Sequence, residues 1–347
     1  MGLALLIVGA DYVTDGAVSV ARRFKVSNLM IGLTVVALGS SMPDIVVCVE
    51  SAFQHKSAMA VGEVIGANTF DLLLVVGIMG LVRPFKVSRI MLTQDLPILV
   101  IASAALWIAG DTVLFDGNHH NIINRSSGIM LIVIFIFYMW FMILSSRYDP
   151  SAADDMDNAQ DSTTALANHD ENSGIVKVHS LRGEMIVLKA EFSRLRGKQW
   201  FSWLMIAGGL VALAIGGNWV VDGASGLAMK IGMSQAMVAL TVVAIGNALP
   251  DLVTSVTATV KGASGIAFGN IVGSCIFNAL LTVGLSAIVT PLNADKIGFV
   301  DFFTVVIASL LLWILPRFTK TRTIGYASGT ILALLYIAYM TFTVIRG

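Results

Sequence analysis

Apolar residues run in long blocks along almost the whole chain, and polar residues collect in the short intervals between the blocks. Each block is long enough, or nearly so, to cross a hydrocarbon layer of about 30 Å as a helix. Lipid offers the backbone no hydrogen bonds, so segments of this kind must be helical. The pattern predicts an all-α polytopic membrane protein with ten transmembrane helices, at residues 3–22, 32–54, 59–82, 92–110 and 127–145, then 200–228, 236–260, 265–289, 299–316 and 324–344.

One long polar stretch, residues 146–199, separates the two sets of five helices. Its first part is small, polar and acidic, which is typical of a solvated, disordered linker. The alternative is a weak calcium sensor made by Asp154, Asp155, Asp157 and Asp161. Its last part has helical periodicity and basic residues, which indicates an interfacial helix. The predicted domains are a first transmembrane repeat (1–145), a partly disordered cytoplasmic linker (146–199) and a second transmembrane repeat (200–347).

The chain repeats itself, without a gap, at an offset of 207 residues. Polar, glycine and proline positions recur together with the apolar background, which makes the repeat a strong signal. The matches join Asp15 to Asp222, Gly39 to Gly246, Pro43 to Pro250, Asp44 to Asp251, Gly62 to Gly269 and Phe70 to Phe277. Because each copy holds an odd number of helices, the two copies are expected to lie in opposite orientations in the bilayer.

Basic residues test this inverted arrangement, because cytoplasmic loops carry an excess of lysine and arginine. With the N-terminus outside, 17 basic residues fall in inside loops and 5 in outside loops. This bias predicts that both termini lie outside a plasma or inner membrane. The first apolar segment lacks a basic n-region and a clear cleavage site, so we expect it to be a retained helix.

Composition narrows the function classes. The chain is 56% hydrophobic and 13% charged, with a mean hydropathy of +0.83, whereas soluble domains carry roughly 25% charged residues. A net charge of zero suggests no nucleic-acid partner. Cys48 and Cys275 lie in apolar segments and are expected to be small buried hydrophobes, with no disulfide framework or cysteine metal site.

Each half carries a proline followed directly by an aspartate inside a predicted helix, in ALGSSMPD at 37–44 and AIGNALPD at 244–251. A proline removes the hydrogen bond to the carbonyl four residues earlier, so the carbonyls of Gly39 and Gly246 are freed and the helices are expected to break. Inverted repeats place a substrate site near the midplane, where such broken helices meet. Carboxylate, carbonyl and hydroxyl oxygens are the ligands of hard cations.

Partner segments bring further oxygens, in GEVIGANTFD at 62–71 and GNIVGSCIFN at 269–278. Glycines four residues apart allow helices to approach closely. The site is therefore expected to combine Asp44, Asp251 and Asp71 with the neutral acceptor Asn278, and with Glu63 one turn below.

An aspartate at the centre of a membrane helix costs roughly 2.5–3.5 kcal/mol, and several together repel one another. A bound cation or a proton must offset this cost. The alternative, acids that are buried and hydrogen-bonded for packing, is strongest for Glu63, because its repeat counterpart is Asn270. We expect capping or gating roles for Asp15 and Asp222, and structural roles for Glu50 and Asp95.

These motifs resemble those of the cation/calcium exchanger superfamily, in its sodium/calcium branch. That family carries two copies of G-[TS]-S-x-P-[ED] followed by G-N-x-x-G-S-N-x-x-[ND]. Here they stand as Gly39–Asp44 with Gly62–Asp71, and Gly246–Asp251 with Gly269–Asn278, so that only the linker is left out. The resemblance implies ten helices, a central site and alternating access in which helices one and six move against the rest.

Residue by residue, the resemblance implies that Asp44 and Asp251 are the principal calcium ligands and that Asp71 and Asn278 complete the sites. It implies sodium-binding oxygens from the carbonyls of Ala37 and Ala244 and from the hydroxyls of Ser40, Ser41 and Ser274. The sequence departs from the family pattern, since Asn247-Ala248 and Ala67 replace hydroxyl-bearing residues and both principal acids are aspartates. These departures leave the stoichiometry and the coupling ion open.

The expected function is a secondary active antiporter that exchanges Ca²⁺ for Na⁺ by alternating access. Both ions bind at the site as substrates, membrane lipid surrounds the chain, no cofactor is expected, and we expect a monomer. One alternative is a proton- or potassium-coupled divalent cation exchanger of the same superfamily. A remote alternative is an intramembrane aspartyl protease, in which paired aspartates would form a catalytic dyad. The Gly-x-Gly-Asp motif typical of such proteases is absent, so no enzyme activity is expected.

Overall fold

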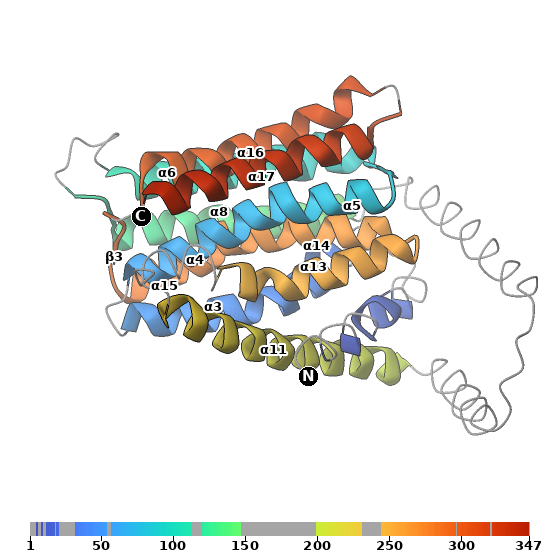
Figure 1. Cartoon of the computed structure of the whole chain (residues 1–347), viewed down its shortest axis with the longest axis horizontal. Helices are drawn as coiled ribbons and strands as arrows, with labels where there is room; N and C mark the ends of the chain where they lie inside the picture. Colours follow the sequence, from blue (N-terminus) through green and yellow to red (C-terminus); the bar gives the residue numbers. More distant parts are fainter. Residues whose placement is uncertain are drawn as a thin grey trace, which may run out of the picture.

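The computed structural model describes residues 5, 8–9, 12–17, 19–20, 32–53, 57–112, 120–146, 199–230, 244–295, 297–319 and 321–346. These residues are almost entirely helical (Figure 1). The first half contains η1 (Gly32–Val36), α3 (Ala37–Phe53), α4 (Ser57–Thr69), η2 (Phe70–Val75), α5 (Val76–Val82), η3 (Met91–Asp95), α6 (Leu96–Gly110) and α8 (Arg125–Ser146), where η marks a π-helical turn. The second half contains α11 (Gln199–Lys230), α13 (Ala244–Val260), α14 (Ser264–Ile276), η5 (Phe277–Thr282), α15 (Val283–Val289), α16 (Phe299–Phe318) and α17 (Tyr326–Arg346).

The predicted helices agree with the structure to within a few residues wherever the structure describes them. The expected helix at 265–289, for example, is the continuous run from Ser264 to Val289. Six helices among the described residues are long and apolar enough to cross a membrane, namely Ala60–Val82, Met91–Gly110, Arg125–Met142, Ser264–Val289, Phe299–Phe318 and Tyr326–Arg346. Parts of the expected helices 3–22 and 236–260, and residues 147–198 with the four linker aspartates and the interfacial helix, lie outside the described residues.

The predicted break at each proline is wrong. α13 continues through Pro250, and α3 runs without interruption past residue 43. Packed neighbouring helices can hold a transmembrane helix together across a proline. The backbone is instead irregular in the partner helices, where η2 and η5 are π-helical turns at corresponding places in the two halves. Such turns disturb the regular hydrogen-bond ladder and recur at functional sites.

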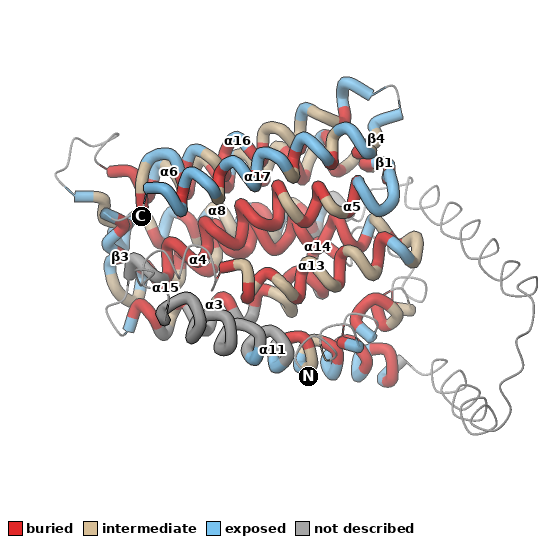
Figure 2. The backbone as a smooth tube through the Cα atoms, viewed as in Figure 1, coloured by how far each residue is buried: buried red, intermediate tan, exposed pale blue. Residues whose placement is uncertain are grey.

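Two central helices form the core of the bundle. α4 and α5 make one of them and α14 and α15 the other, and both lie between α16 and α17 on one side and α11 on the other (Figure 1). In each central helix, 83% of the most apolar stretch of 18 residues is buried, whereas the figure is 28% for the helix at Tyr326–Arg346. Figure 2 shows the same contrast, with buried central helices and outer helices that expose one face. The central pair therefore forms the scaffold that surrounds any site inside the bundle.

Four strands of two residues each, β1 (Phe85–Lys86), β2 (Ile122–Ile123), β3 (Leu292–Asn293) and β4 (Thr323–Ile324), join the halves. β1 pairs with β4 and β2 pairs with β3, both antiparallel, so each sheet takes one strand from each half. β3 follows β1 by the repeat offset, since 292 − 85 = 207. The two sheets lie at opposite ends of the bundle in Figure 2. These strands were not predicted, because two residues are too few for a periodic signal.

A polar contact reinforces the β2–β3 sheet. The Asp295 carboxylate accepts hydrogen bonds from the backbone N–H of Asn121 at 2.7 Å and from Asn293 Nδ2 at 3.1 Å. It also lies 2.9 Å from His120 Nδ1. The Asn121 N–H, followed by these side chains, lowers the pKa of Asp295 from its ordinary value, because each stabilises the ionised form. Asp295 therefore stays ionised at every pH at which an ordinary aspartate is ionised, and the contact between the two halves is kept.

Glycines bring corresponding helices of the two halves into close contact. A Cβ atom on Gly329 in α17 would lie 2.6 Å from the carbonyl oxygen of Gly77 in α5. A Cβ atom on Gly128 in α8 would lie 2.8 Å from the carbonyl oxygen of Gly284 in α15. Gly284 follows Gly77 by the repeat offset of 207 residues. The same small-residue packing, which membrane helices use for close approach, therefore occurs in both halves.

Gly329→Ala is expected to destabilise the bundle, because the added methyl group would overlap backbone that cannot rotate away. Overpacking of this kind costs about 1–3 kcal/mol, and thermal melting of the purified protein in detergent measures it. Gly208→Ala is the matched control, since nothing lies within 4 Å of a Cβ built there. That variant is expected to melt no earlier than the wild type, because alanine favours helix over glycine. Equal melting temperatures for the two variants would contradict the assigned close contact.

Candidate functional site

Two buried aspartates from different halves lie within range of each other's charge. Asp44 comes from α3 and is 7% exposed, and Asp251 comes from α13 and is 6% exposed. Asn278 Nδ2 donates a hydrogen bond of 2.9 Å to Asp44 Oδ2. Asn270 Nδ2 donates one of 2.8 Å to Asp251 Oδ1. The structure thus brings both predicted principal acids together, each beside an amide from the second half.

Asp71, in the π-helical turn η2, is the acid with the least support from its surroundings. It is 1% exposed, and no hydrogen-bond donor among the described residues reaches either of its carboxylate oxygens. Its carboxyl group interacts with that of Asp251 and lies within range of the charge of Asp44. Asp44 Oδ1 also lacks a donor within the described part of the chain. Buried polar atoms normally have a hydrogen-bond partner. These carboxylate oxygens therefore need a donor or a positive charge that the described residues do not provide.

Hydroxyl groups border the acids. Ser40 Oγ lies 3.2 Å from the carbonyl oxygen of Ala37 and 3.0 Å from Ser274 Oγ. Both serines interact with the carboxylate of Asp251. Ser41 Oγ is fully buried and has no partner among the described residues. Ser40 and Ser274 therefore border the acidic cluster, and Ser41 is buried next to Ser40 along the same helix.

The ends of the same helices place the two predicted carbonyls. Ala37 is the first residue of α3 and Ala244 is the first described residue of α13, and both are fully buried. Gly273 in α14 allows α3 to come close, since a Cβ atom there would lie 2.5 Å from the methyl group of Ala37. The helices that carry the two principal acids therefore also carry these backbone oxygens inside the bundle.

Glu63 is buried but, unlike Asp71, has donors. Asn247 Nδ2 donates a hydrogen bond to Glu63 Oε1, and Cys48 Sγ lies 3.8 Å from Glu63 Oε2. The sequence did not predict Asn247 or Cys48 as partners of this acid. Glu63 lies close enough to Asp44 for the two carboxyl groups to interact, so it borders the cluster.

Asn270 is a third residue that the sequence analysis did not place in the site. Besides its bond to Asp251, it receives a hydrogen bond of 3.2 Å from Ser40 Oγ. The contact of Ser40 with Asn270 corresponds to that of Asn247 with Glu63, because 247 − 40 and 270 − 63 both equal 207. The repeat offset was the signal that could have found both amides, since it aligns Asn270 with Glu63 and Asn247 with Ser40.

One hydrogen bond joins a residue to its own counterpart in the other half. Asn68 Nδ2 donates to the carbonyl oxygen of Cys275 at 3.1 Å, and the two residues are separated by the repeat offset of 207. A residue can touch its own counterpart only where the two copies face each other. Cys275 also lies within range of the charges of Asp71, Asp251 and Asp44, so the acidic cluster lies near this contact between the halves.

Basic partners for the cluster are missing from the described part of the chain. The ion pairs described there, Lys261–Asp15, Arg346–Asp301 and His120–Asp295, involve none of its acids. The pairing of Asp15 with a lysine agrees with its placement outside the ligand set, while its gating role stays a prediction. Asp95 is buried in η3, and the side chains of Glu50 and Asp222 lie outside the described residues.

The described residues contain no ready-made group of three or more histidine, cysteine, aspartate or glutamate side chains that could hold a metal ion. The cluster instead alternates carboxylates with amides and hydroxyls. The carboxylate, amide and hydroxyl oxygens of these groups are ligands that favour hard cations over transition metals.

A family comparison decides what kind of protein carries this cluster. The family described as sodium/calcium exchanger protein matches residues 1–144 and 201–345. The chain belongs to the sodium/calcium exchanger family. The resemblance found in the sequence motifs is thereby confirmed. Members of this family are membrane antiporters and not enzymes, so the protease alternative is set aside.

Relatives cover nearly the whole exchanger chain. It is 29% identical to the inner membrane protein YrbG of Escherichia coli, over 98% of this chain and 94% of that one. It is 30% identical to the putative antiporter CaxA of Alkalimonas amylolytica, over 98% and 95%. It is 26% identical to the sodium/calcium exchanger MaX1 of Methanosarcina acetivorans, over 98% and 95%.

A solved structure shares the fold. The sodium-calcium exchanger NCX_Mj, soaked with 2.5 mM Na⁺ and 0.1 mM Ca²⁺, superposes with a TM-score of 0.71 at 25% identity, over 98% of this chain and 95% of that one. The exchanger described here is therefore similar in fold, along its whole length, to a sodium-calcium exchanger.

Proposed function

We propose that this exchanger carries Ca²⁺ in one direction against Na⁺ in the other. The observation that carries the proposal is Asp71, a fully enclosed acid for which the described residues provide neither a donor nor a basic partner. Its neighbours Asp44 and Asp251 are acids too, close enough to interact with it. Uncompensated charges in a low-dielectric interior cost several kcal/mol each. Bound cations, or protons in their place, therefore neutralise the cluster while it is closed to water.

The proposed calcium ligands are the carboxylates of Asp44, Asp251 and Asp71 with the amide oxygen of Asn278. Sodium would use the carbonyls of Ala37 and Ala244 and the hydroxyls of Ser40, Ser41 and Ser274. The unpartnered hydroxyl of Ser41 supports this assignment, since a buried hydroxyl without a partner is unfavourable unless something binds it. The oxygens of Glu63 already accept from Asn247 and Cys48, so we place Glu63 at the border of the site.

Exchange follows from competition for these oxygens. One carboxylate cluster can hold a single divalent ion or several monovalent ions, and the empty, charged cluster is too costly to enclose. We infer alternating access in which the first helix and α11 move together. Their close packing supports this inference. A Cβ atom on Gly9 would lie only 2.8 Å from the carbonyl oxygen of Gly209, so the two helices are in direct contact there.

The proposed architecture is ten helices in two inverted repeats, at 1–145 and 200–347, with a cytoplasmic linker at 146–199 and both termini outside. The symmetric strand pairs at opposite ends of the bundle support the inversion. The family match, which stops at residue 144 and resumes at 201, supports the domain limits. A relative described as an inner membrane protein supports that location. We expect the monomer to suffice, because both halves of the site come from one chain.

Flux into proteoliposomes tests the proposal, with calcium, sodium, potassium and protons varied one at a time. An outward sodium gradient alone is expected to drive calcium uptake, without potassium and without a pH gradient. Uptake driven by a pH gradient in the absence of sodium would replace the proposal with proton coupling. An absolute requirement for potassium would replace it with the potassium-coupled alternative. The missing hydroxyls at Asn247-Ala248 are the feature that keeps these alternatives in the test.

A further inference from the structure

Tyr336, in α17, is a buried tyrosine close to the acid that lacks donors. Its side chain is 6% exposed and makes no hydrogen bond to any of the described residues. Buried tyrosine hydroxyl groups usually find a partner. Tyr336 lies within range of the charge of Asp71, whose two carboxylate oxygens also have no partner in the described part of the chain. A donor without an acceptor and an acceptor without a donor therefore lie near each other.

A ring contact holds Tyr336 beside the π-helical turn η2. α17 packs on α5 and on η2. The ring of Tyr336 meets the ring of Phe70 edge to face, with the ring centres 5.6 Å apart. Phe70 directly precedes Asp71 in this turn. One residue of η2 therefore fixes the tyrosine ring, and the next residue carries the unpartnered carboxylate.

The other half repeats this ring contact without the hydroxyl group. α8 and α17 correspond at an offset of 201 residues, which relates their close-contact glycines Gly128 and Gly329. At the same offset, Tyr336 corresponds to Phe135. The ring of Phe135 meets that of Phe277 edge to face, with the ring centres 5.0 Å apart, and Phe277 directly precedes the neutral amide of the cluster. A phenylalanine therefore stands beside the amide, and a tyrosine stands beside the acid.

The amide side has a hydroxyl group on its own helix. Thr282 Oγ1 lies 3.5 Å from Asn278 Oδ1. At the repeat offset of 207 residues, Thr282 corresponds to Val75, which has no hydroxyl group. The equivalent donor is therefore missing from the helix that carries Asp71, and Tyr336 brings a hydroxyl group from a different helix.

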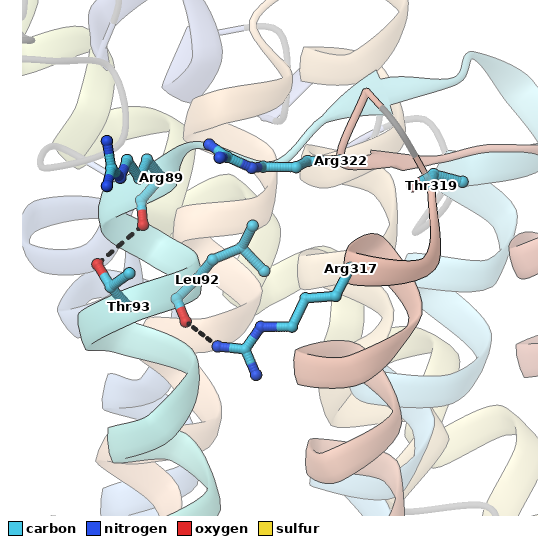
Figure 3. A pocket seen from close by; sticks show the side chains of 6 residues that line it. All are labelled: Arg89, Leu92, Thr93, Arg317, Thr319 and Arg322. Carbon is cyan, nitrogen blue, oxygen red and sulfur yellow. Dashed lines mark hydrogen bonds between the residues drawn. The ribbon is translucent and has the colours of Figure 1, made fainter.

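Polar contacts hold the backbone of α17 in place around Tyr336. One turn further along the helix, Tyr339 donates its hydroxyl group to Asp301 Oδ1 at 3.1 Å, which ties α17 to α16. α16 is tied in turn to η3, because Arg317 donates to the carbonyl oxygen of Leu92 at 3.3 Å (Figure 3). We therefore expect the side chain of Tyr336, and not the helix, to move.

We propose that Tyr336 is a positioning residue that donates its hydroxyl group to Asp71 when a cation leaves that carboxylate, and that gives the carboxylate up when a cation binds. This inference rests on the proposed function, because it treats Asp71 as a cation ligand. A hydrogen bond to a charged group is stronger than one between neutral groups, so the tyrosine competes with the cation. The competition lowers the affinity of the site and speeds the release of calcium.

Calcium binding by the purified protein in detergent tests this role, measured by isothermal titration calorimetry without sodium. Tyr336→Phe keeps the ring on Phe70 and removes only the hydroxyl group. We expect calcium to bind about tenfold more tightly to this variant, because the competing donor is lost. Sodium-driven uptake into proteoliposomes is expected to show a lower KM for calcium together with a lower maximal rate. A loss of packing alone would not tighten binding.

Tyr138→Phe is the matched control. Tyr138 is also a buried tyrosine of an outer helix, and its hydroxyl group lacks a partner among the described residues, but the acid within range of it is Asp95. This variant is expected to bind calcium as the wild type does. In the Asp71→Asn background, Tyr336→Phe is expected to lose most of its effect, since the charged acceptor is gone.

The outcomes separate this inference from the proposed function. Unchanged or weaker calcium binding by Tyr336→Phe, or an equal gain in the Asp71→Asn background, would overturn the role of Tyr336 alone. A wild-type protein that binds no calcium would overturn the proposed function and this inference with it.

Discussion

Replacing either Asp44 or Asp251 by asparagine is expected to abolish calcium uptake driven by a sodium gradient in proteoliposomes. The two side chains have nearly the same shape, so the change removes a charge and leaves the packing in place. In the occupied site each carboxylate would pair with the bound cation, and removing one partner of such a buried pair costs about 3–5 kcal/mol. About 1.4 kcal/mol corresponds to a factor of ten. Uptake at low calcium is therefore expected to fall by roughly a hundredfold or more in each variant.

Asp95→Asn is the matched control for these variants. Asp95 is also a buried aspartate in a membrane-spanning helix, and one of its oxygens also lacks a donor among the described residues, but it lies outside the cluster. Its replacement is expected to leave sodium-driven calcium uptake close to the wild-type rate. Full activity of both the Asp44→Asn and the Asp251→Asn variants would remove these acids from the transport site.

The sequence predicts the helices well and singles out the candidate acids, because both stand out against a uniform background. Asp44 and Asp251 are charged residues within apolar blocks, and each follows a proline at the same place in the repeat. Lipid gives such blocks no alternative to a helix, so their bounds follow from hydropathy alone. The strand pairs and the uninterrupted course of α13 through Pro250 could not be predicted, because both depend on neighbours that are distant in sequence.

The partners of the acids were harder to find than the acids themselves. An asparagine in an apolar helix carries no charge, and its contribution depends on what it reaches across the helix interface. Asn270 reaches Asp251, and Asn278 reaches Asp44, from the other half or from a neighbouring helix. The π-helical turns that hold Asp71 and Asn278 leave no mark in the hydrophobic pattern. The sequence analysis named Asn278 as a member of the site, and the repeat offset, applied to every neutral residue, would have pointed to Asn270 as well.

The same offset leads to the second large effect, which concerns the acid and amide in the two π-helical turns. Asp71 interacts with Asp251, and Asn278 interacts with Asp44, so the two residues occupy equivalent places on either side of the cluster. Asp71→Asn alone removes a charge that the described residues leave unpaired, and sodium-driven calcium uptake is expected to fall by about tenfold or more. Asn278→Asp alone adds a charge beside Asp44 and removes its amide donor, so it is also expected to impair uptake.

The double variant Asp71→Asn with Asn278→Asp separates charge from position. It restores the number of carboxylates and moves one of them across the pseudo-symmetry of the site. If cations need a fixed negative charge at either equivalent place, the double variant regains most of the uptake that Asp71→Asn loses. If the double variant loses as much uptake as the two single variants combined, Asp71 acts through its own surroundings and not through the total charge of the cluster. Wild-type uptake by the Asp71→Asn variant would remove Asp71 from the ligand set, because transport would then not need its carboxylate.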